Sequence, residues 1–292
     1  MDAHNPQHGR ASVARNAGVI SLAVMASRVL GLARDQVFAV FFGAGLHFDA
    51  FVTAFRIPNL LRDLFAEGAL SSAFVTTFTQ TLSGKGKEAA IRLSNRVATL
   101  IVLFVSAISV VAWFYAPAIV HTLAPGFFDV PGKAALTIEL TRIMIPFLLL
   151  IALAAQAMGM LNAFNSFGLP ALSSAFFNIG SIVGGLVLGF SLGPVIGLAP
   201  IAGMAYGTLI GGFLQLAVQW PSLRRRGIRY RPDFSLSDPG VRQILRLMGP
   251  AIIGTAAVQI NVFVNTNFAS EIIDPASGAV LNGTVSGLGY TF

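Results

Sequence analysis

Four arginines and four acidic residues interrupt two apolar stretches near the N-terminus of this 292-residue chain. A charge at the centre of a bilayer costs about 2.5–3.5 kcal/mol, so it is tolerated only where it faces a protein interior, water or a partner. The eight residues are Arg28, Arg34, Asp35, Asp49, Arg56, Arg62, Asp63 and Glu67. We expect none of them to face lipid.

Helical phase gathers these residues on one face of each stretch, at about 100° per residue. The polar face of the first stretch holds Ser27, Arg28, Gly31, Arg34 and Asp35. The second holds Asp49, Thr53, Arg56, Asp63 and Glu67, with Asn59 and Arg62 to one side. The sequence therefore predicts two polar faces that meet across one cavity.

The chemistry predicted for this cavity is anion binding. Planar guanidinium groups bind phosphate through two hydrogen bonds and stay ionised when partly buried, which favours Arg28, Arg34 and Arg62 as ligands. Asp35 and Asp63 each follow an arginine and are expected to neutralise it. The alternative is that all eight charges form interhelical ion pairs that only fix the packing.

Other functions find little support. The chain has no cysteine, and its four histidines, at positions 4, 8, 47 and 121, have no metal-ligand spacing. We therefore expect no enzyme, no metal site and no cofactor. The net charge of +7 resides mainly in short stretches between apolar segments, a pattern typical of membrane proteins rather than nucleic-acid binding.

Composition defines the fold class as all-α, a polytopic helical membrane protein. Hydrophobic residues make up 55% of the chain, charged residues only 11%, and residues 143–223 carry no charge. A span needs about 20 apolar helical residues. Seven spans are predicted at about 16–42, 47–82, 93–124, 134–162, 170–192, 195–220 and 241–270. An eighth is expected to begin near Ser277.

The longest polar connection divides the chain into parts. We expect a basic tail (1–15), a six-helix transmembrane lobe (16–220), a basic connection (221–240) and the start of a second lobe (241–292). With the N-terminus inside, inner stretches hold thirteen basic residues and outer loops only Lys133. The positive-inside rule thus places the N-terminus, the tail and the connection in the cytoplasm.

Two smaller predictions concern polar residues in the later spans. Glu139 and Arg142 lie three residues apart on one helix and are expected to pair with one another. Ten amide residues in the later spans are expected to hold helices together through hydrogen bonds, the alternative being that they line a pathway. They are Gln156, Asn162, Asn165, Asn178, Gln215, Gln219, Gln259, Asn261, Asn265 and Asn267.

Several motifs in the first two stretches are similar to those of a known family. They are Ser27-Arg28-Val29-Leu30-Gly31-Leu32-Ala33-Arg34-Asp35, Phe42-Gly43-Ala44-Gly45, Asp49-Ala50-Phe51, Ile57-Pro58-Asn59-Leu60-Leu61-Arg62 and Phe65-Ala66-Glu67-Gly68-Ala69. In these residues the chain resembles the MurJ/MviN lipid II flippases, over about residues 15–280. The resemblance implies the multidrug/oligosaccharidyl-lipid/polysaccharide exporter superfamily, with two six-helix lobes around a cavity and two further helices.

The resemblance also implies a function. The substrate would be lipid II, the undecaprenyl-pyrophosphate-linked peptidoglycan precursor, moved from the inner to the outer leaflet of the bacterial cytoplasmic (inner) membrane by alternating access. The family's cavity residues carry over to Arg28, Arg34, Asp49, Arg62 and Glu67, and Ser27 and Asn59 match motif positions beside them. The expected partners are lipid II, the bilayer and cell-wall synthesis proteins, without nucleic acid.

The chain departs from the family in length. Family members have about fourteen helices, whereas seven or eight are predicted here, so we expect a fragment, a frameshift near Val280 or a short form. Such a chain is expected to be too short for activity alone. The alternatives are a related exporter of other cargo, such as an O-antigen-unit flippase or a drug/cation antiporter, and a membrane scaffold that recruits cell-wall enzymes through the basic 224–231 loop.

Overall fold

The computed structural model describes residues 6–63, 70–235, 238–274 and 277–288, and in these ranges the chain is helical with one isolated bridge, Ile273 to Val280. The α-helices are α1 (Pro6–Phe42), α2 (Leu46–Leu61), α3 (Ser71–Lys85), α4 (Lys87–Phe114), α5 (Ala116–Leu123), α6 (Lys133–Met144), α7 (Phe147–Ala163), α8 (Gly168–Leu186), α9 (Gly193–Ile196), α10 (Pro200–Ala217), α11 (Trp220–Arg225), α12 (Pro239–Ser270) and α13 (Thr284–Leu288). A 3-10 helix, η2 (Pro125–Asp129), and a π-helix, η3 (Val187–Leu192), complete the description. The all-α fold class is confirmed.

Five helical segments of the described residues are long and apolar enough to cross a membrane. They are Lys87–Phe114, Lys133–Ala163, Gly168–Ile196, Pro200–Arg225 and Pro239–Ser270. These five correspond to the third to seventh predicted spans. The first two predicted spans, which contain the charged residues, correspond to α1 and to α2 with α3.

Prolines and glycines divide the spans more finely than the sequence predicted. The expected second span, 47–82, is described as α2 and α3, and Pro58 lies inside α2. The expected third span ends at Tyr115, because Pro117 has no N–H to donate and sits in the first turn of a new helix, α5. The predicted turn after Phe42 is confirmed, and Gly43 adopts φ +59°, which glycine tolerates without strain.

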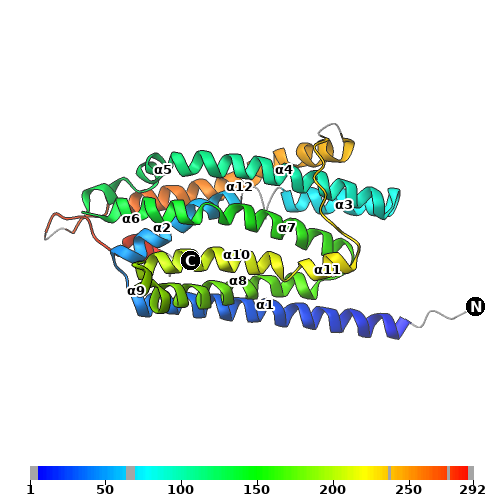
Figure 1. Ribbon diagram of the computed structural model, residues 1–292, viewed down its shortest axis with the longest axis horizontal. Coiled ribbons are helices and arrows are strands. Elements are labelled where there is room, and N and C mark those ends of the chain that lie inside the picture. The colour runs from blue at the N-terminus through cyan, green and yellow to red at the C-terminus, as the bar shows by residue number, and fades with distance from the viewer. Residues whose placement is uncertain (1–5, 64–69, 236–237, 275–276, 289–292) are drawn as a thin grey trace, which may run out of the picture.

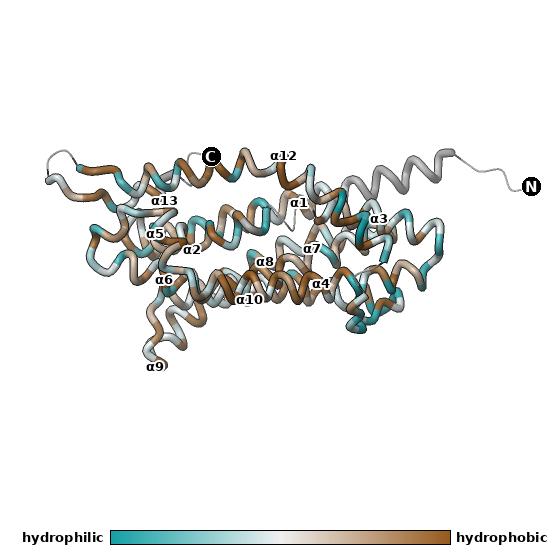
Figure 2. Tube along the Cα trace, turned by 90° about the horizontal axis from the view of Figure 1, so that it is seen from above, coloured by the Kyte–Doolittle hydropathy of each residue, from teal (hydrophilic) through white to brown (hydrophobic). Residues whose placement is uncertain are grey.

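The bundle has two ends, which Figure 1 shows at left and right. The "turn end" comprises residues 43–45, 124–132, 193–199, 271–274 and 277–283, and the "basic end" comprises residues 84–87, 164–167 and 222–235. Helix α1 runs from the basic end to the turn end, and α2 returns in the opposite direction. Hydrophilic residues gather at the basic end near α3 (Figure 2).

Two apolar clusters hold the helices around α2. The larger joins α3, α4 and α7 with the first turns of α12, through residues such as Phe74, Phe78 and Ile244. The smaller joins the end of α1 with α2, α6 and α10, through Phe38 and Met144 among others. Helix α2 is therefore fixed by packing at the turn end before any polar contact is considered.

Helix α12 is buried only near its two ends. Its buried residues are Val241 and Ile244 near the start and Thr266, Ala269 and Ser270 near the end. At the turn end the backbone of Ser270 lies so close to Gly126 that a Cβ at position 126 would meet the carbonyl oxygen at 2.0 Å. Whether a lobe boundary lies at 221–240 remains a prediction.

Helices α8 and α10 pack backbone against backbone, and α1 lies along α8 (Figure 1). A Cβ added at Gly207 would be 2.4 Å from the nitrogen of Gly185, and one at Gly203 would be 2.3 Å from Gly189. Small residues allow this approach, which is a principal source of attraction between helices in lipid.

We expect Gly207→Leu to separate α8 from α10 and to lower the free energy of unfolding by about 1–3 kcal/mol or more, as overpacking does. Gly254→Leu is the matched control, since a Cβ there would meet nothing within 4 Å. Unfolding of the purified chain by denaturant in micelles measures both. Equal stabilities would contradict the packing argument.

Candidate functional site

A cavity of about 260 Å³ lies between α1, α2, α8, α10 and α13. We call it the arginine pocket. Its walls are Arg34, Asp35, Phe38, Phe48, Phe51, Val52, Phe55, Arg56, Asn59, Ser181, Thr208 and Ser286. The pocket thus combines two guanidinium groups and one carboxylate with a largely aromatic wall.

Arg34 reaches the pocket from α1. Its Nη2 lies 3.0 Å from Oδ1 of Asp35, so the predicted neutralisation by the adjacent acid is confirmed. Its guanidinium carbon also lies 5.9 Å and 5.7 Å from the ring centroids of Phe55 and Phe177. At these distances the aromatic faces attract the cation and orient it.

Arg56 reaches the pocket from α2, although the sequence analysis did not place it among the expected ligands. Its Nη1 donates a hydrogen bond to Oγ1 of Thr266, on α12. A hydroxyl carries no charge, so this contact orients the guanidinium without neutralising it. The signal was present in the sequence, because Arg56 shares a helical face with Asp49 and Asp63.

Asn59 lies on the same wall, one turn further along α2. Its Oδ1 is buried and accepts no hydrogen bond within the described part of the chain. An unpaired buried carbonyl oxygen costs about 1–3 kcal/mol, so a donor that entered the pocket would be favoured here.

Arg28 and Arg62 do not line the arginine pocket. Each lies six residues from its counterpart, Arg34 or Arg56, which is about 9 Å along a helix and toward the basic end. Arg28 is exposed, and Arg62 pairs with Asp63 at 2.9 Å, as predicted. The arginines thus form two levels, each with one residue from α1 and one from α2.

The remaining candidates on these helices have different surroundings. The carbonyl oxygen of Ser27 accepts a hydrogen bond from Nδ2 of Asn178 at 3.1 Å, which joins α1 to α8. Asp63 accepts a hydrogen bond from Nε2 of Gln259 on α12 at 3.3 Å. Glu67 falls outside the described residues.

Asp49 is fully buried at the turn end, where its carboxylate is occupied by protein groups. It lies 2.7 Å from Nζ of Lys133 and accepts hydrogen bonds from the backbone nitrogens of Gly283 and Ser286, at 2.7 Å and 2.8 Å. This carboxylate therefore links α2 to α6 and to the segment that contains α13. It does not line the arginine pocket.

Lys133 is the partner that the sequence analysis missed. We expected this residue in an outer loop, but its side chain is fully buried, with Nζ 4.0 Å from the ring centroid of Phe127 and 3.0 Å from Oδ1 of Asn282. The sequence indicated this role only indirectly, because Lys133 is the one basic residue in the predicted outer loops.

The expected pair of Glu139 and Arg142 was wrong. Nε of Arg142 donates to the carbonyl oxygen of Trp113 at 3.3 Å, and its guanidinium lies 4.8 Å from the indole centroid. The expected polar links between helices are confirmed for Gln156 and Gln219, which donate to the carbonyl oxygens of Ser94 and Ala154.

The arginine pocket is suited to binding an anion. Its titratable residues are Arg34, Asp35 and Arg56, which leave one positive charge in excess. Arginines in a site from which water is largely excluded attract phosphate more strongly than they do in water.

A helical bundle with a cationic pocket between its helices is typical of a membrane transporter. A solved outward-facing structure of a multidrug resistance MATE family transporter of the MOP superfamily superposes with a TM-score of 0.64 at 15% identity, covering 85% of this chain and 52% of that one. At this identity the likeness shows the fold alone.

Sequence comparison is more specific. Residues 38–291 match the family model for lipid II flippase MurJ. The lipid II flippase MurJ of Burkholderia cenocepacia is 36% identical over 250 residues, 84% of this chain and 48% of that protein. The probable lipid II flippase MurJ of Rhizobium meliloti is 35% identical over 269 residues, 89% of this chain and 48% of that protein.

A solved structure, of lipid II flippase MurJ in an inward closed conformation, superposes with a TM-score of 0.73 at 29% identity and covers 93% of this chain and 53% of that one. The chain therefore belongs to the lipid II flippase MurJ family, as the motifs indicated, and is a multi-pass inner membrane protein. It spans about half the length of the curated relatives it matches.

Replacement of Lys133 by methionine would leave the Asp49 carboxylate buried without its cation. Removing one partner of a buried pair costs about 3–5 kcal/mol, so Lys133→Met should lower the free energy of unfolding by that amount. Lys85→Met, at an exposed lysine, is the control. Denaturant unfolding in micelles measures the difference, and adding Asp49→Asn to Lys133→Met should recover part of the loss.

Proposed function

We propose that this chain is the N-terminal part of a lipid II flippase, and that it binds the undecaprenyl-pyrophosphate-linked peptidoglycan precursor through the arginine pocket. The observation that carries the proposal is the pair of arginines, Arg34 and Arg56, between apolar helices with only one carboxylate beside them. A diphosphate supplies the negative charge that this pocket lacks.

The main physical barrier to translocation is the transfer of the charged diphosphate from water into the membrane. A phosphate group stripped of water in hydrocarbon has a prohibitive free energy, and guanidinium groups replace the lost hydration with charged hydrogen bonds. The two levels of arginine, about 9 Å apart, give the diphosphate successive partners along α1 and α2. Arg28, Arg62 and Glu67 belong to this proposal, with Ser27 and Asn59 beside them.

The turn end supports alternating access. Asp49 joins α2 to the segment after α12, and Gly126 lies against Ser270, so at this end the first six predicted spans contact the later part of the chain. In our proposal these contacts break when the pocket opens to the outer leaflet. Asp49 thus acts in closure rather than as a direct ligand.

Translocation needs more than this chain in our proposal, because the relatives are about twice as long. The described helices provide one wall of the pathway. We also propose that cell-wall synthesis proteins act with the whole protein, since its product is their substrate. A related exporter of other cargo and a scaffold remain as outcomes of the binding test below.

Binding tests the pocket directly. We expect the purified chain in nanodiscs to bind lipid II, and Arg34→Gln or Arg56→Gln to weaken binding about 10- to 100-fold, since each removes a hydrogen bond to a charged group. Arg142→Gln is the control, because it removes an arginine that stacks on Trp113 outside the pocket.

A neutral prenol of the same chain length should bind far more weakly than lipid II. Equal binding of the prenol, or unchanged affinity in both pocket variants, would refute the proposal. Preference for an organic cation would favour an exporter of other cargo. No binding of either, with retained recruitment of cell-wall enzymes, would favour the scaffold.

The proposed orientation places the basic end in the cytoplasm. The chain has no cysteine, so single cysteines can be introduced without background. A membrane-impermeant maleimide added to intact spheroplasts should label Ala279→Cys, at the turn end, and should label Ser235→Cys, at the basic end, only after permeabilisation. The reverse pattern would overturn the orientation.

A further inference from the structure

A second cavity, of about 240 Å³, lies at the basic end between α4, α7, the end of α10, α11 and residues 228–230. We call it the interface pocket. One part of its wall is apolar, with Val102, Leu153, Leu216 and Met160. The opposite part is polar, with Ser94, Asn95, Gln156 and Tyr230. The cavity shares no lining residue with the arginine pocket.

One polar group in this wall has no partner. The Oγ of Ser94 donates to the carbonyl oxygen of Ile91, Nε2 of Gln156 donates to that of Ser94, and the hydroxyl of Tyr230 lies 3.2 Å from Oγ1 of Thr99. Asn95 is only 8% exposed, yet its side-chain amide makes no hydrogen bond among the described residues. The Asn95 amide atoms are not among the buried unpaired atoms of the described residues, and the residue lines the cavity, so the amide is available to donate to and accept from polar atoms of an occupant.

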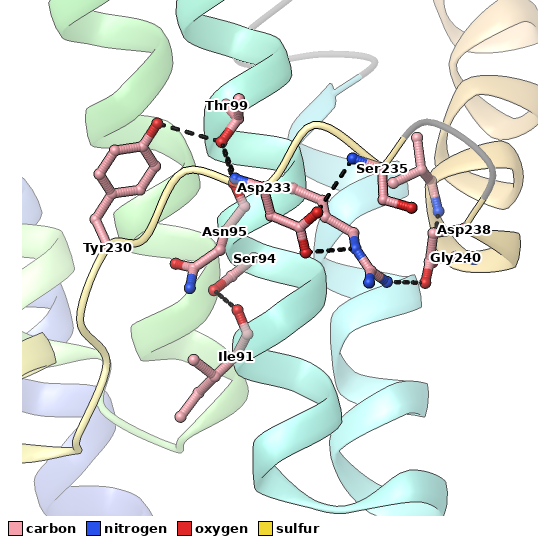
Figure 3. Close-up of polar contacts among 11 residues, drawn as sticks. Ile91, Ser94, Asn95, Thr99, Tyr230, Asp233, Ser235, Asp238 and Gly240 are labelled. Carbon is pink, nitrogen blue, oxygen red and sulfur yellow. Dashed lines mark hydrogen bonds and ion pairs between the residues drawn. The ribbon is translucent and has the colours of Figure 1, made fainter.

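The polar wall is held in place from the other side of α4. Nε of Arg96 binds Oδ2 of Asp233 at 2.8 Å, and Nη1 binds the carboxylate of Asp238, which caps α12 by accepting from Gly240 at 2.7 Å. In Figure 3 the Asn95 amide points toward the side where Tyr230 lies, and Asp233 and Asp238 lie on the opposite side of Asn95. Arg96 therefore pairs with both acids and offsets one of their two negative charges, and none of these three residues lines the pocket.

The rim of the pocket has the residues of a membrane interface. Trp220 and Tyr230 line the cavity and are both exposed, as aromatic residues at the level of lipid headgroups are. The guanidinium carbon of Arg224 lies 5.4 Å from the Trp220 ring centroid, and Arg224 itself is exposed. Arg224 does not itself line the cavity, but it places a cation against the Trp220 ring, which does.

We propose that the interface pocket binds an anionic phospholipid of the cytoplasmic leaflet. Arg224 contacts the phosphate, the Asn95 amide contacts the ester region, and part of one acyl chain fills the apolar interior. Basic pockets between helices on the cytoplasmic side are suited to acidic headgroups. The volume accommodates only a segment of a chain, and the rest of the lipid lies in the bilayer. This site shares no lining residue with the arginine pocket and does not depend on lipid II binding, but its assignment to the cytoplasmic leaflet rests on the orientation proposed above.

The two tryptophans of the chain allow a direct test. In Trp113→Phe the one remaining indole is Trp220, at the pocket, and in Trp220→Phe it is Trp113, near the opposite end of α4. Each variant is reconstituted in phosphatidylcholine vesicles with a minor fraction of lipid brominated on its acyl chains, either phosphatidylglycerol or phosphatidylcholine. Bromine quenches an indole that it contacts.

We expect brominated phosphatidylglycerol to quench Trp220 about five-fold more effectively than brominated phosphatidylcholine, the preference that one basic residue near a membrane surface provides. Trp113 should show a ratio near one. It is a matched control, because an arginine also stacks on its ring, at 4.8 Å, but it does not line the interface pocket. A ratio near one for Trp220, or the same preference for both indoles, would overturn the proposal.

Substitutions then assign the preference to the pocket. Arg224→Gln and Asn95→Leu, each in Trp113→Phe, should reduce the ratio toward one, whereas Arg242→Gln, an exposed arginine on α12, should leave it unchanged. A ratio that Arg224→Gln and Arg242→Gln reduce equally would indicate general attraction to basic surface and would refute the site. The comparison of the two indoles decides the question even if Asn95→Leu fails to fold.

Discussion

A charge that leaves water must find a partner, and this constraint determines how α2 is held. Asp49 binds Lys133 of α6, Arg56 binds Thr266 of α12, and Asp63, which neutralises Arg62, accepts from Gln259 of α12. Each contact lies at a different height along α2. The charged side chains that would make α2 unfavourable in hydrocarbon are therefore the same groups that bind it to neighbouring helices.

The pattern of pairing also creates the positive character of the arginine pocket. Arg34 has an acid as its next neighbour, whereas the described hydrogen-bond partner of Arg56 is a hydroxyl. Were Thr266 a carboxylate, the pocket would have no net charge and no electrostatic reason to attract a diphosphate. The net charge of the pocket thus depends on a neutral residue of α12, which lies more than two hundred residues further along the chain.

Local regularities made much of this predictable from the sequence. Helical phase placed Arg34 and Arg56 on polar faces, with Asn59 to one side, and adjacency alone identified Asp35 and Asp63 as neutralisers. Charge and hydropathy located the later spans, although prolines such as Pro117 divided them further. These features depend on residues within one or two helical turns of each other.

The remaining features depend on tertiary contacts that no local pattern encodes. Lys133 finds Asp49 across 84 residues, and the backbone donors of Gly283 and Ser286 come from a short segment with little periodicity. Glu139 and Arg142 have suitable spacing for a pair, but Trp113 offered the arginine both a carbonyl oxygen and an aromatic face. The roles of the seven candidate site residues stay predictions until binding is measured.

The glycine contact between α8 and α10 has a consequence for motion. Where two backbones touch, no side chain stands between them that could change rotamer and let one helix slide past the other. Any rearrangement must therefore move α8 and α10 together as one rigid body, with α1 lying along it. Bending would then occur in helices with few buried residues, above all in the middle of α12, whose buried residues lie near its two ends.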